Sequence, residues 1–356
     1  MRVFVFVNRV EEIGFRQTTA LLVAASIRAG HEVYLADVGS GGITPPERNS
    51  QHRQTASTHH DCSLPSTFIS ADCIRSHFDA PSKVYSQAVA DFSRASRTQK
   101  RQQIMIRTDD IVLIRTNPGR DLQRSNLHRA FLHWCRIAVS CGIRVINHPE
   151  KLDFYASKAA VLSLPEAFRP AMLVSNDHDQ IASFIKDLGC DCVIKPLTGS
   201  RGENVIRVHP STSELKHLLS TVYTNQSVAV QQFVESDEPG DQRVVVLDGE
   251  VIRHGRHVAG IHRIPAKGDF RANLHAGGKA APLQLTARQF DCVHHAARML
   301  YNDGIRLAGI DLVGHKVIEF NVYSTGGMYD ANRFAQTDFT DQIVYQIMQG
   351  ACSTKS

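Results

Sequence analysis

The sequence of 356 residues lacks several features that would assign it to well-known classes. No apolar run approaches the roughly 18 residues that a membrane-spanning helix needs, so we expect no membrane partner. It contains no arm dense in lysine and arginine, and no basic face interleaved with aromatic residues. We therefore expect no nucleic-acid partner either.

The cysteines form no recognisable metal or disulfide pattern. There are eight, and the closest pair, Cys190 and Cys192, has no second pair that could complete a zinc site. Residues 1–7 are too short for a signal peptide and lack a cleavage-site pattern. We therefore expect reduced thiols and a cytoplasmic location.

The composition is that of an ordinary globular enzyme or binding protein. Hydrophobic residues make up 42% of the chain and charged residues 21%. The length predicts two or three lobes. The net charge of +5 suits small anionic substrates.

The first part of the chain predicts a parallel sheet. Residues 2–7 form a β-rich run, a helix is expected over 16–29, and a strand follows at 32–36. The loop after the first strand lacks G-x-G-x-x-G, so the dinucleotide fingerprint is absent. Residues 40–105 are polar and show little periodicity, and we interpret them as a partly mobile excursion with short elements near 66–74.

Regular structure resumes with a strand at 110–115, a helix at 126–141 and a strand at 144–146. Arg115 stands at the carboxyl end of its strand, where ligands bind in open α/β sheets, although a surface arginine is the alternative. The cluster from His59 to Cys62 resembles a metal box, but we interpret it as a polar loop because its surroundings are polar throughout.

Two stretches of the middle region suggest a nucleotide site. Lys195 ends an apolar strand, and a half-buried lysine needs an anionic partner. The loop from Gly199 to Gly202 follows it, and glycine lets a backbone approach a phosphate closely, although most such hairpins are only turns. G-K-[ST] is missing, so this is not a P-loop. The strand at 228–234 then runs into a polar linker, where backbone groups could bind an adenine base.

A β-hairpin near the C-terminus carries oxygen ligands. Runs at 307–313 and 316–322 flank a two-residue turn. Alternation places Glu319 and Asn321 on one face, with Asp311 on the partner strand. These oxygens suit a hard cation such as Mg²⁺, which usually completes its shell with phosphates and water. The alternative is an acidic hairpin that faces solvent.

In this order, these stretches resemble the ATP-grasp superfamily, and within it the prokaryotic glutathione synthetases. The most specific motif is the Arg-Ile-Pro that begins at Arg263 and leads into Arg-x-Asn-x-x-x-Gly-Gly, from Arg271 to Gly278. The resemblance implies an α/β, three-lobed ATP-grasp fold with an N-terminal parallel-sheet (pre-ATP-grasp) domain. Its expected domains are an N-terminal substrate domain at 1–146, a central lobe at 147–234 and a C-terminal lobe with the metal site at 235–356.

The resemblance also implies ATP-dependent ligation of a carboxylate to an amine through an acyl phosphate. The substrates would be small molecules, the metal would be two Mg²⁺ ions or Mn²⁺ in their place, and the assembly would be a homo-oligomer. It assigns ATP to Lys158, Lys195, Gly199, Ser200, Gly202, Gln231, Gln232, Phe233, Val234 and Asp241; catalysis to Arg243 and Arg271; substrate to Arg115, Arg263, Asn273, Gly277 and Gly278; and metal to Asp311, Glu319 and Asn321.

Departures from the family pattern leave the substrate pair open. The glycine hairpin reads Gly-Ser-Arg-Gly, and the stretch after Val322 reads Tyr-Ser-Thr-Gly-Gly where a Thr-Ser-Pro type of sequence is expected. γ-Glutamylcysteine and glycine are the leading substrates. The alternatives are another small carboxylate and amino acid in a specialised metabolite pathway, or a nucleotide-binding regulatory module without ligase activity.

Overall fold

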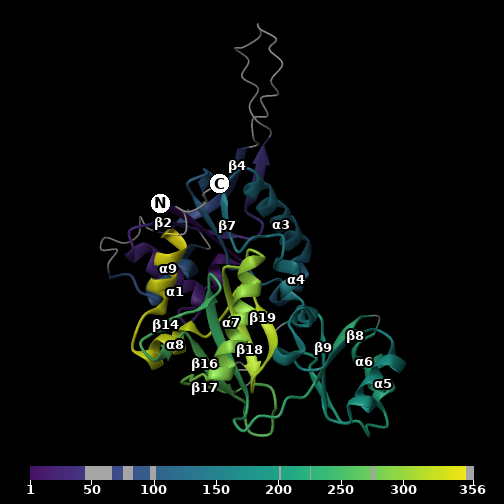
Figure 1. The fold of residues 1–356 in the computed structure, drawn as a ribbon. Helices are drawn as coiled ribbons and strands as arrows, with labels where there is room; N and C mark the ends of the chain where they lie inside the picture. Colours follow the sequence, from purple (N-terminus) through teal and green to yellow (C-terminus); the bar gives the residue numbers. More distant parts are fainter. Residues whose placement is uncertain are drawn as a thin grey trace, which may run out of the picture.

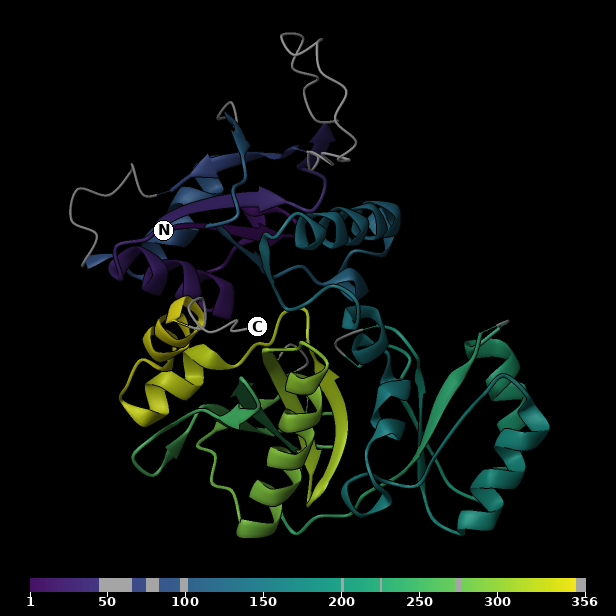
Figure 2. The same cartoon turned by 45° about the horizontal axis from the view of Figure 1, so that its top comes forward.

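The computed structural model describes residues 1–44, 66–74, 83–96, 102–199, 202–224, 226–272, 274 and 277–349. Three larger sheets and a small hairpin organise this part of the chain. The sheets fall in turn within residues 1–146, 147–234 and 235–356, and the domain boundaries themselves stay predictions. The central lobe, which carries β8, β9, α5 and α6, stands to one side of the other two (Figures 1 and 2).

The first sheet has the order β3-β4-β2-β1-β6-β7, with β5 paired to β4. β1, β2, β6 and β7 run parallel, as the βαβ opening predicts. Its strands are β1 (Arg2–Val7), β2 (Glu32–Asp37), β3 (Gly41–Thr44), β4 (Ser66–Cys73), β5 (Gln102–Met105), β6 (Ile111–Ile114) and β7 (Arg144–Ile146).

Alternation along β1 divides the core of this sheet between its two faces. Val3 and Val5 pack with α1 (Thr18–Arg28) and α2 (Ser86–Ala95). Phe4 and Phe6 pack against α3 (Ser125–Ser140), where the Phe6 ring lies 4.6 Å from Phe131 and 5.2 Å from Trp134, between ring centroids.

Most predicted elements of this lobe are confirmed, but the polar excursion also contains β3, α2 and β5, which were not predicted. β4 occupies the stretch where short elements were expected. The interpretation of 40–105 missed α2, whose polar residues hide a short buried face of Val89, Ala90 and Phe92. The cluster from His59 to Cys62 lies outside the described residues.

The central lobe is an antiparallel sheet in the order β10-β9-β11-β8, with two helices on one face. Asp177 caps the first helix by accepting hydrogen bonds from the backbone of the first turn, which stabilises the helix start. Its elements are β8 (Met172–Ser175), β9 (Cys192–Pro196), β10 (Ile206–Val208), β11 (Val228–Gln232), α5 (His178–Leu188) and α6 (Leu215–Val222).

The third sheet has the order β17-β16-β12-β18-β19, with β13 paired to β12. The predicted hairpin is confirmed as β18 and β19. Residues of α7 pack with this sheet in one core, and α7 begins with a capping box of Thr286 and Gln289. Its elements are β12 (Asp241–Leu247), β13 (Glu250–Val251), β16 (Gly260–Ile264), β17 (Lys279–Ala281), β18 (Leu307–Val313), β19 (Lys316–Asn321) and α7 (Ala287–Asn302), beside the small hairpin of β14 (Arg253–His254) and β15 (His257–Val258).

Short helices connect the lobes, and α4 (Leu152–Ala156) contacts β19. At the other end of the chain, α8 (Met328–Ala335) and α9 (Phe339–Gln349) return to contact α1, as Figure 2 shows. Arg28 of α1 donates to Asp338 at 2.7 Å and to Asp341 at 2.6 Å. The 3-10 turns are Val10–Glu12, Pro118–Arg120, Leu122–Arg124, Lys158–Ser163 and Glu166–Phe168.

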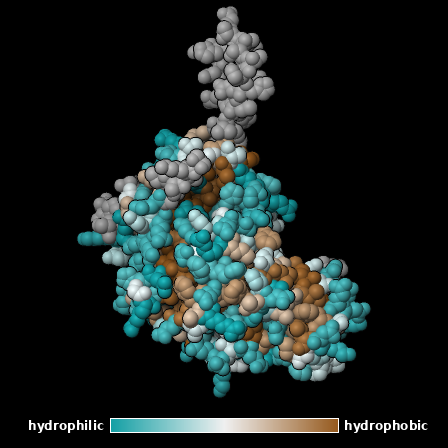
Figure 3. Space-filling view, in the orientation of Figure 1, coloured by the Kyte–Doolittle hydropathy of each residue, from teal (hydrophilic) through white to brown (hydrophobic). Residues whose placement is uncertain are grey.

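The face shown in Figure 3 is predominantly hydrophilic, with smaller hydrophobic groups between the polar side chains. Among the described helices, none combines the length and the apolar composition that crossing a membrane requires.

Candidate active site

A cavity of about 980 Å³ opens where the three lobes meet. The first lobe contributes the loop after β1, the start of α1 and Arg115. The inner faces of the central and C-terminal sheets form the opposite walls. Most of the predicted site residues line this one cavity, so the fold brings together positions that span more than half of the chain.

Two lysines form the central-lobe wall. Lys195 on β9 is 8% exposed, and its Nζ donates to Gln231 Oε1 at 2.6 Å. Lys158 is 6% exposed, and its Nζ donates to the Gly199 carbonyl at 3.3 Å. Neither forms an ion pair with a carboxylate in the part of the chain that the structure describes. Burial lowers the pKa of Lys195. Both lysines thus suit an anionic ligand.

The glycine loop lies beside these lysines. Gly199 and Gly202 line the cavity and have φ values of 129° and 70°, a region that side chains rarely adopt. A Cβ on Gly119 of the first lobe would lie 3.3 Å from the Gly199 carbonyl carbon. The loop therefore lies directly against the first lobe. The predicted ligand Ser200 lies outside the described residues.

The end of β11 and the linker after it line one part of the cavity. The predicted residues Gln231, Gln232, Phe233 and Val234 all line it, together with Val193 and Ile318, which sequence reasoning missed. The Phe233 amide donates to the Asp191 carbonyl at 2.7 Å, and the Arg207 guanidinium lies 3.7 Å from the centre of the Phe233 ring. The linker is thus fixed at its start, and the apolar walls suit a flat ring.

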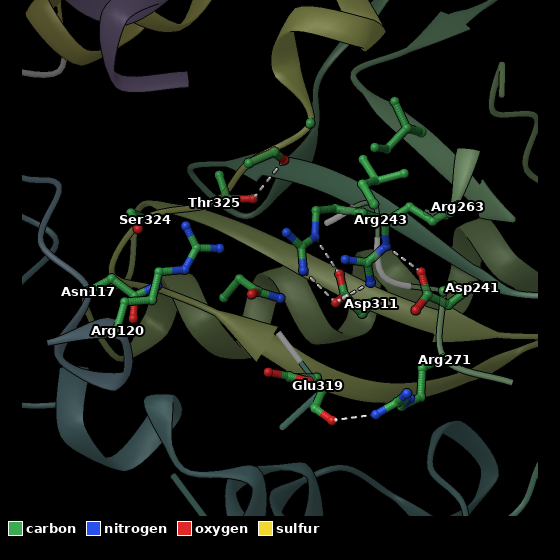
Figure 4. Close-up of a pocket in the computed structure, with 18 of the residues that line it drawn as sticks. Asn117, Arg120, Asp241, Arg243, Arg263, Arg271, Asp311, Glu319, Ser324 and Thr325 are labelled. Carbon is green, nitrogen blue, oxygen red and sulfur yellow. Dashed lines mark hydrogen bonds and ion pairs between the residues drawn. The ribbon is translucent and has the colours of Figure 1, made fainter. Parts of the chain in front are cut away.

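Four charged residues form a continuous network on the C-terminal sheet (Figure 4). Strand register places Arg243 opposite Asp311 and Asp241 opposite Arg263. Arg243 donates to both oxygens of Asp311, each at 2.7 Å. Arg263 donates to Asp311 at 2.7 Å and to Asp241 at 2.5 Å. Bidentate contacts of this kind fix planar groups firmly.

The pKa values of the two carboxyl groups in this network shift in opposite directions. Burial would raise the pKa of Asp311, but the charges of Arg243 and Arg263 outweigh it and hold the pKa well below its usual range. Burial raises the pKa of Asp241 to about 6, aided by the charge of Asp311 and opposed by Arg263. Asp311 is therefore ionised at neutral pH.

The predicted metal ligands meet beside this network. Glu319 stands opposite Asp311 across the hairpin, and all three ligands line the cavity. Within the described chain, Glu319 makes no hydrogen bond or ion pair, and the buried amide nitrogen of Asn321 has no partner. No group of three or more His, Cys, Asp or Glu side chains forms a complete metal site there. Two carboxylates and an amide oxygen fit Mg²⁺, provided that a bound molecule supplies further oxygens.

The predicted catalytic residue Arg243 lines the cavity, as do most of the predicted substrate residues. Arg115, Arg263 and Gly278 line the cavity, whereas Gly277 is not part of its lining. Asn273 lies outside the described residues. Arg271 also lines the cavity, pairs with Asp269 at 2.9 Å and donates to the Gly202 carbonyl at 3.2 Å.

The loop between β19 and α8 forms the far end of the cavity and is fixed at several points. Asn147 donates to the Val322 carbonyl at 2.7 Å, and the Tyr323 hydroxyl donates to Asp153 at 2.6 Å. Arg115 donates to the Thr325 carbonyl at 2.8 Å. The Thr325 side chain lies over Gly309, where a Cβ would come within 2.2 Å of its hydroxyl. Other lining residues that sequence reasoning missed are Thr18, Thr19, Asn117, Arg120, Ser324 and Arg333.

Comparisons with known proteins identify the family. Residues 157–336 match the family model described as the prokaryotic glutathione synthetase, ATP-grasp domain. The chain is 30% identical over 243 residues to the glutathione synthetase of Parasynechococcus marenigrum. The aligned region covers 67% of this chain and 74% of that protein. It is also 30% identical over 241 residues to the glutathione synthetase of Mesorhizobium japonicum, and this alignment covers 65% of this chain and 72% of that protein.

Solved structures share the fold at low identity. The ATP-grasp ligase PsnB complexed with its minimal precursor has a TM-score of 0.57 and 16% identity, with 98% of both chains covered. D-cycloserine synthetase DcsG has a TM-score of 0.54 and 15% identity, with 96% of this chain and 99% of that chain covered. These likenesses support an ATP-grasp architecture.

Proposed function

Because the chain belongs to the family of prokaryotic glutathione synthetase ATP-grasp domains and is an ATP-dependent carboxylate–amine ligase, we propose that it is a glutathione synthetase. It would join γ-glutamylcysteine to glycine and convert ATP to ADP and phosphate. The observation that carries this proposal is that two buried lysines, the linker from Gln231 to Val234 and the Asp311 network all line one cavity.

The residues divide the work of the reaction. Lys158 and Lys195 hold the ATP phosphates, the linker from Gln231 to Val234 holds the base, and Asp241 stands near the ribose. Asp311, Glu319 and Asn321 would hold Mg²⁺, taken as two ions or replaced by Mn²⁺, and the metal would neutralise phosphate charge when bound.

The acceptor carboxylate then attacks the γ-phosphate of ATP and forms an acyl phosphate. The amine attacks the acyl carbon, and phosphate leaves from the tetrahedral intermediate. Arg243 is fixed on Asp311 and stabilises the charge that develops on the transferred group, without having to reorganise. Arg271 and the glycine loop close the rim. The implied homo-oligomer stays a prediction.

A second candidate is a related ligase for a different carboxylate and amine. The observation that favours it is the loop after β19, in which Tyr323 is buried and donates to Asp153 at 2.6 Å. This anchor fixes the part of the cavity where the departures from the family pattern lie, so the incoming amine could differ from glycine.

The test is ATP-dependent phosphate release with γ-glutamylcysteine and a panel of amino acids offered one at a time. We expect turnover that requires both γ-glutamylcysteine and glycine. Turnover with another amine would support the second candidate. No turnover with any amine, despite ATP binding, would show that γ-glutamylcysteine is not the acceptor.

A further inference from the structure

The start of α1 faces the cavity on the first-lobe side. The helix has 11 residues, begins at Thr18, and has no side-chain cap at Gln17. Gln17, Thr18 and Thr19 all line the cavity. The first N–H groups of a helix have no partner within the helix, and this end carries partial positive charge. A helix start alone is not a site, but two further observations point to a ligand here.

The first is the Thr18 hydroxyl. Thr18 is 2% exposed, and within the described residues its Oγ1 has no hydrogen-bond partner. A buried hydroxyl without a partner is unfavourable and uncommon. Because the side chain lines the cavity, a molecule bound there would supply the missing partner.

The second is the charge of Arg115, which is 6% exposed. Its Nε donates to Thr19 Oγ1 at 3.3 Å, and its Nη2 donates to the Thr325 carbonyl at 2.8 Å. No carboxylate pairs with it in the portion of the chain that the structure describes, and burial lowers its pKa to about 10. A guanidinium has five N–H donors, so donors remain for an anion. Buried charges are normally paired.

The distance from this group to the Asp311 network is short. Arg115 contacts the carbonyl of Thr325, and a Cβ on the next residue, Gly326, would lie 3.9 Å from Arg243 Nη1. Neighbouring Cα atoms are about 3.8 Å apart, so a molecule a few bonds long can reach both arginines.

We propose that the first turn of α1, the Thr18 hydroxyl and Arg115 bind a second carboxylate of the acceptor. The acceptor is then a short dicarboxylate, with one carboxylate reacting beside Arg243 and the other held at the helix start. This inference rests on the proposed function, under which the second carboxylate is the glutamyl α-carboxylate of γ-glutamylcysteine.

The test compares Thr18→Val with Thr116→Val in the full-length protein. Thr116 is the matched control, because its hydroxyl is also buried without a partner in the described chain but does not line the cavity. Both variants remove an unpaired hydroxyl at nearly constant volume, so neither should melt below the wild type. The probes are γ-glutamylcysteine, its analogue with the glutamyl α-carboxylate converted to an amide, glutarate and inorganic phosphate, titrated calorimetrically without ATP.

We expect Thr18→Val to weaken γ-glutamylcysteine and glutarate about tenfold, as for a hydrogen bond to a charged group. Thr116→Val should leave both affinities unchanged, and the amide analogue should bind weakly to all three proteins. Unchanged affinities in Thr18→Val overturn the proposal, as does a failure of both dicarboxylates to bind. Phosphate that binds more tightly than either overturns the assignment to a carboxylate. Thr18-dependent binding of glutarate without binding of γ-glutamylcysteine supports this subsite and contradicts the proposed function.

Discussion

Two sets of charged side chains line the same cavity and differ in how their charges are balanced. The paired set consists of Asp241, Arg243, Arg263 and Asp311, which neutralise one another across three strands. The unpaired set consists of Arg115, Lys158, Lys195 and Glu319, none of which forms an ion pair within the described residues.

This difference indicates that the paired set has a structural role and that the unpaired set binds ligands. The geometry of the paired set is fixed in the free protein, so it can stabilise developing charge without reorganising. The unpaired set carries desolvated or repelling charges whose cost is offset only when a ligand arrives. Removing a member of the paired set should therefore damage the fold, and removing a member of the unpaired set should damage only binding and turnover.

The strongest test of the paired set is Asp311→Asn. It leaves two arginines, whose side chains are only 13% and 14% exposed, without their shared counter-charge. We therefore expect a loss of about 3–5 kcal/mol in the free energy of unfolding, together with the loss of turnover. Urea denaturation measures the first and phosphate release the second. The control is Asp248→Asn, which breaks a more exposed bidentate contact with Arg306 at 2.6 and 2.8 Å and should cost about 1 kcal/mol or less. Equal losses of unfolding free energy in the two variants would show that the network contributes no more to stability than an ordinary surface ion pair.

Glu319→Gln tests the unpaired set. Because Glu319 has no partner in the described structure, its loss should change the free energy of unfolding by less than about 0.5 kcal/mol. Turnover should fall at least about 100-fold, since a predicted metal ligand is lost. Parallel urea and phosphate-release measurements check both values. Near-normal turnover would show that the β18–β19 hairpin is not part of the active site.

Lys195→Met separates nucleotide binding from stability. The free protein should change by about 1 kcal/mol or less, because the loss of the bond to Gln231 is balanced by the removal of a desolvated charge. Saturating ATP and Mg²⁺ should raise the melting temperature of the wild type by mass action, and most of this shift should disappear in the variant. A full shift in Lys195→Met would mean that the lysine does not contact the phosphates.

The smallest effect is expected at Asp177, the cap of α5 on the far side of the central lobe. Asp177→Ala should cost about 1 kcal/mol in unfolding free energy and leave kcat and KM unchanged. This variant is a control that shows how far a loss of stability in the central lobe by itself changes turnover. A clear fall in the kcat of Asp177→Ala would mean that turnover reports on stability rather than on the site.

Local signals predicted much of this molecule. The βαβ opening follows from apolar runs separated by a helical period, and the β18–β19 hairpin follows from its two-residue turn at Gly314 and His315. The resemblance to a known family assigned the two lysines, the linker after β11 and the predicted metal ligands to one site, and all of them line one cavity. These features depend on residues that are close in sequence or share a recognisable motif.

The paired set could not be predicted from the sequence in the same way. Its contacts depend on the register of β12 against β16 and β18, which join residues up to 68 positions apart. A shift of one residue would turn Arg243 to the opposite face. Arg263 and Asp241 were assigned to substrate and nucleotide, and nothing in the sequence indicated that they bond to each other. Thr18 was missed because a threonine at a helix start gives no sign of lacking a partner.

The contact of α8 and α9 with α1 limits how the first lobe can be exchanged between relatives. Arg28 ties the first lobe to Asp338 and Asp341, and Ile343 and Val344 of α9 belong to the same buried core as Leu22 and Val23 of α1. The helix α1 and the segment of α8 and α9 are thus one structural unit, although 310 positions separate Arg28 from Asp338. A chimera that replaces the first lobe with that of a relative should carry the relative's segment equivalent to residues 328–349 as well, and recombination at a single crossover point would divide this unit.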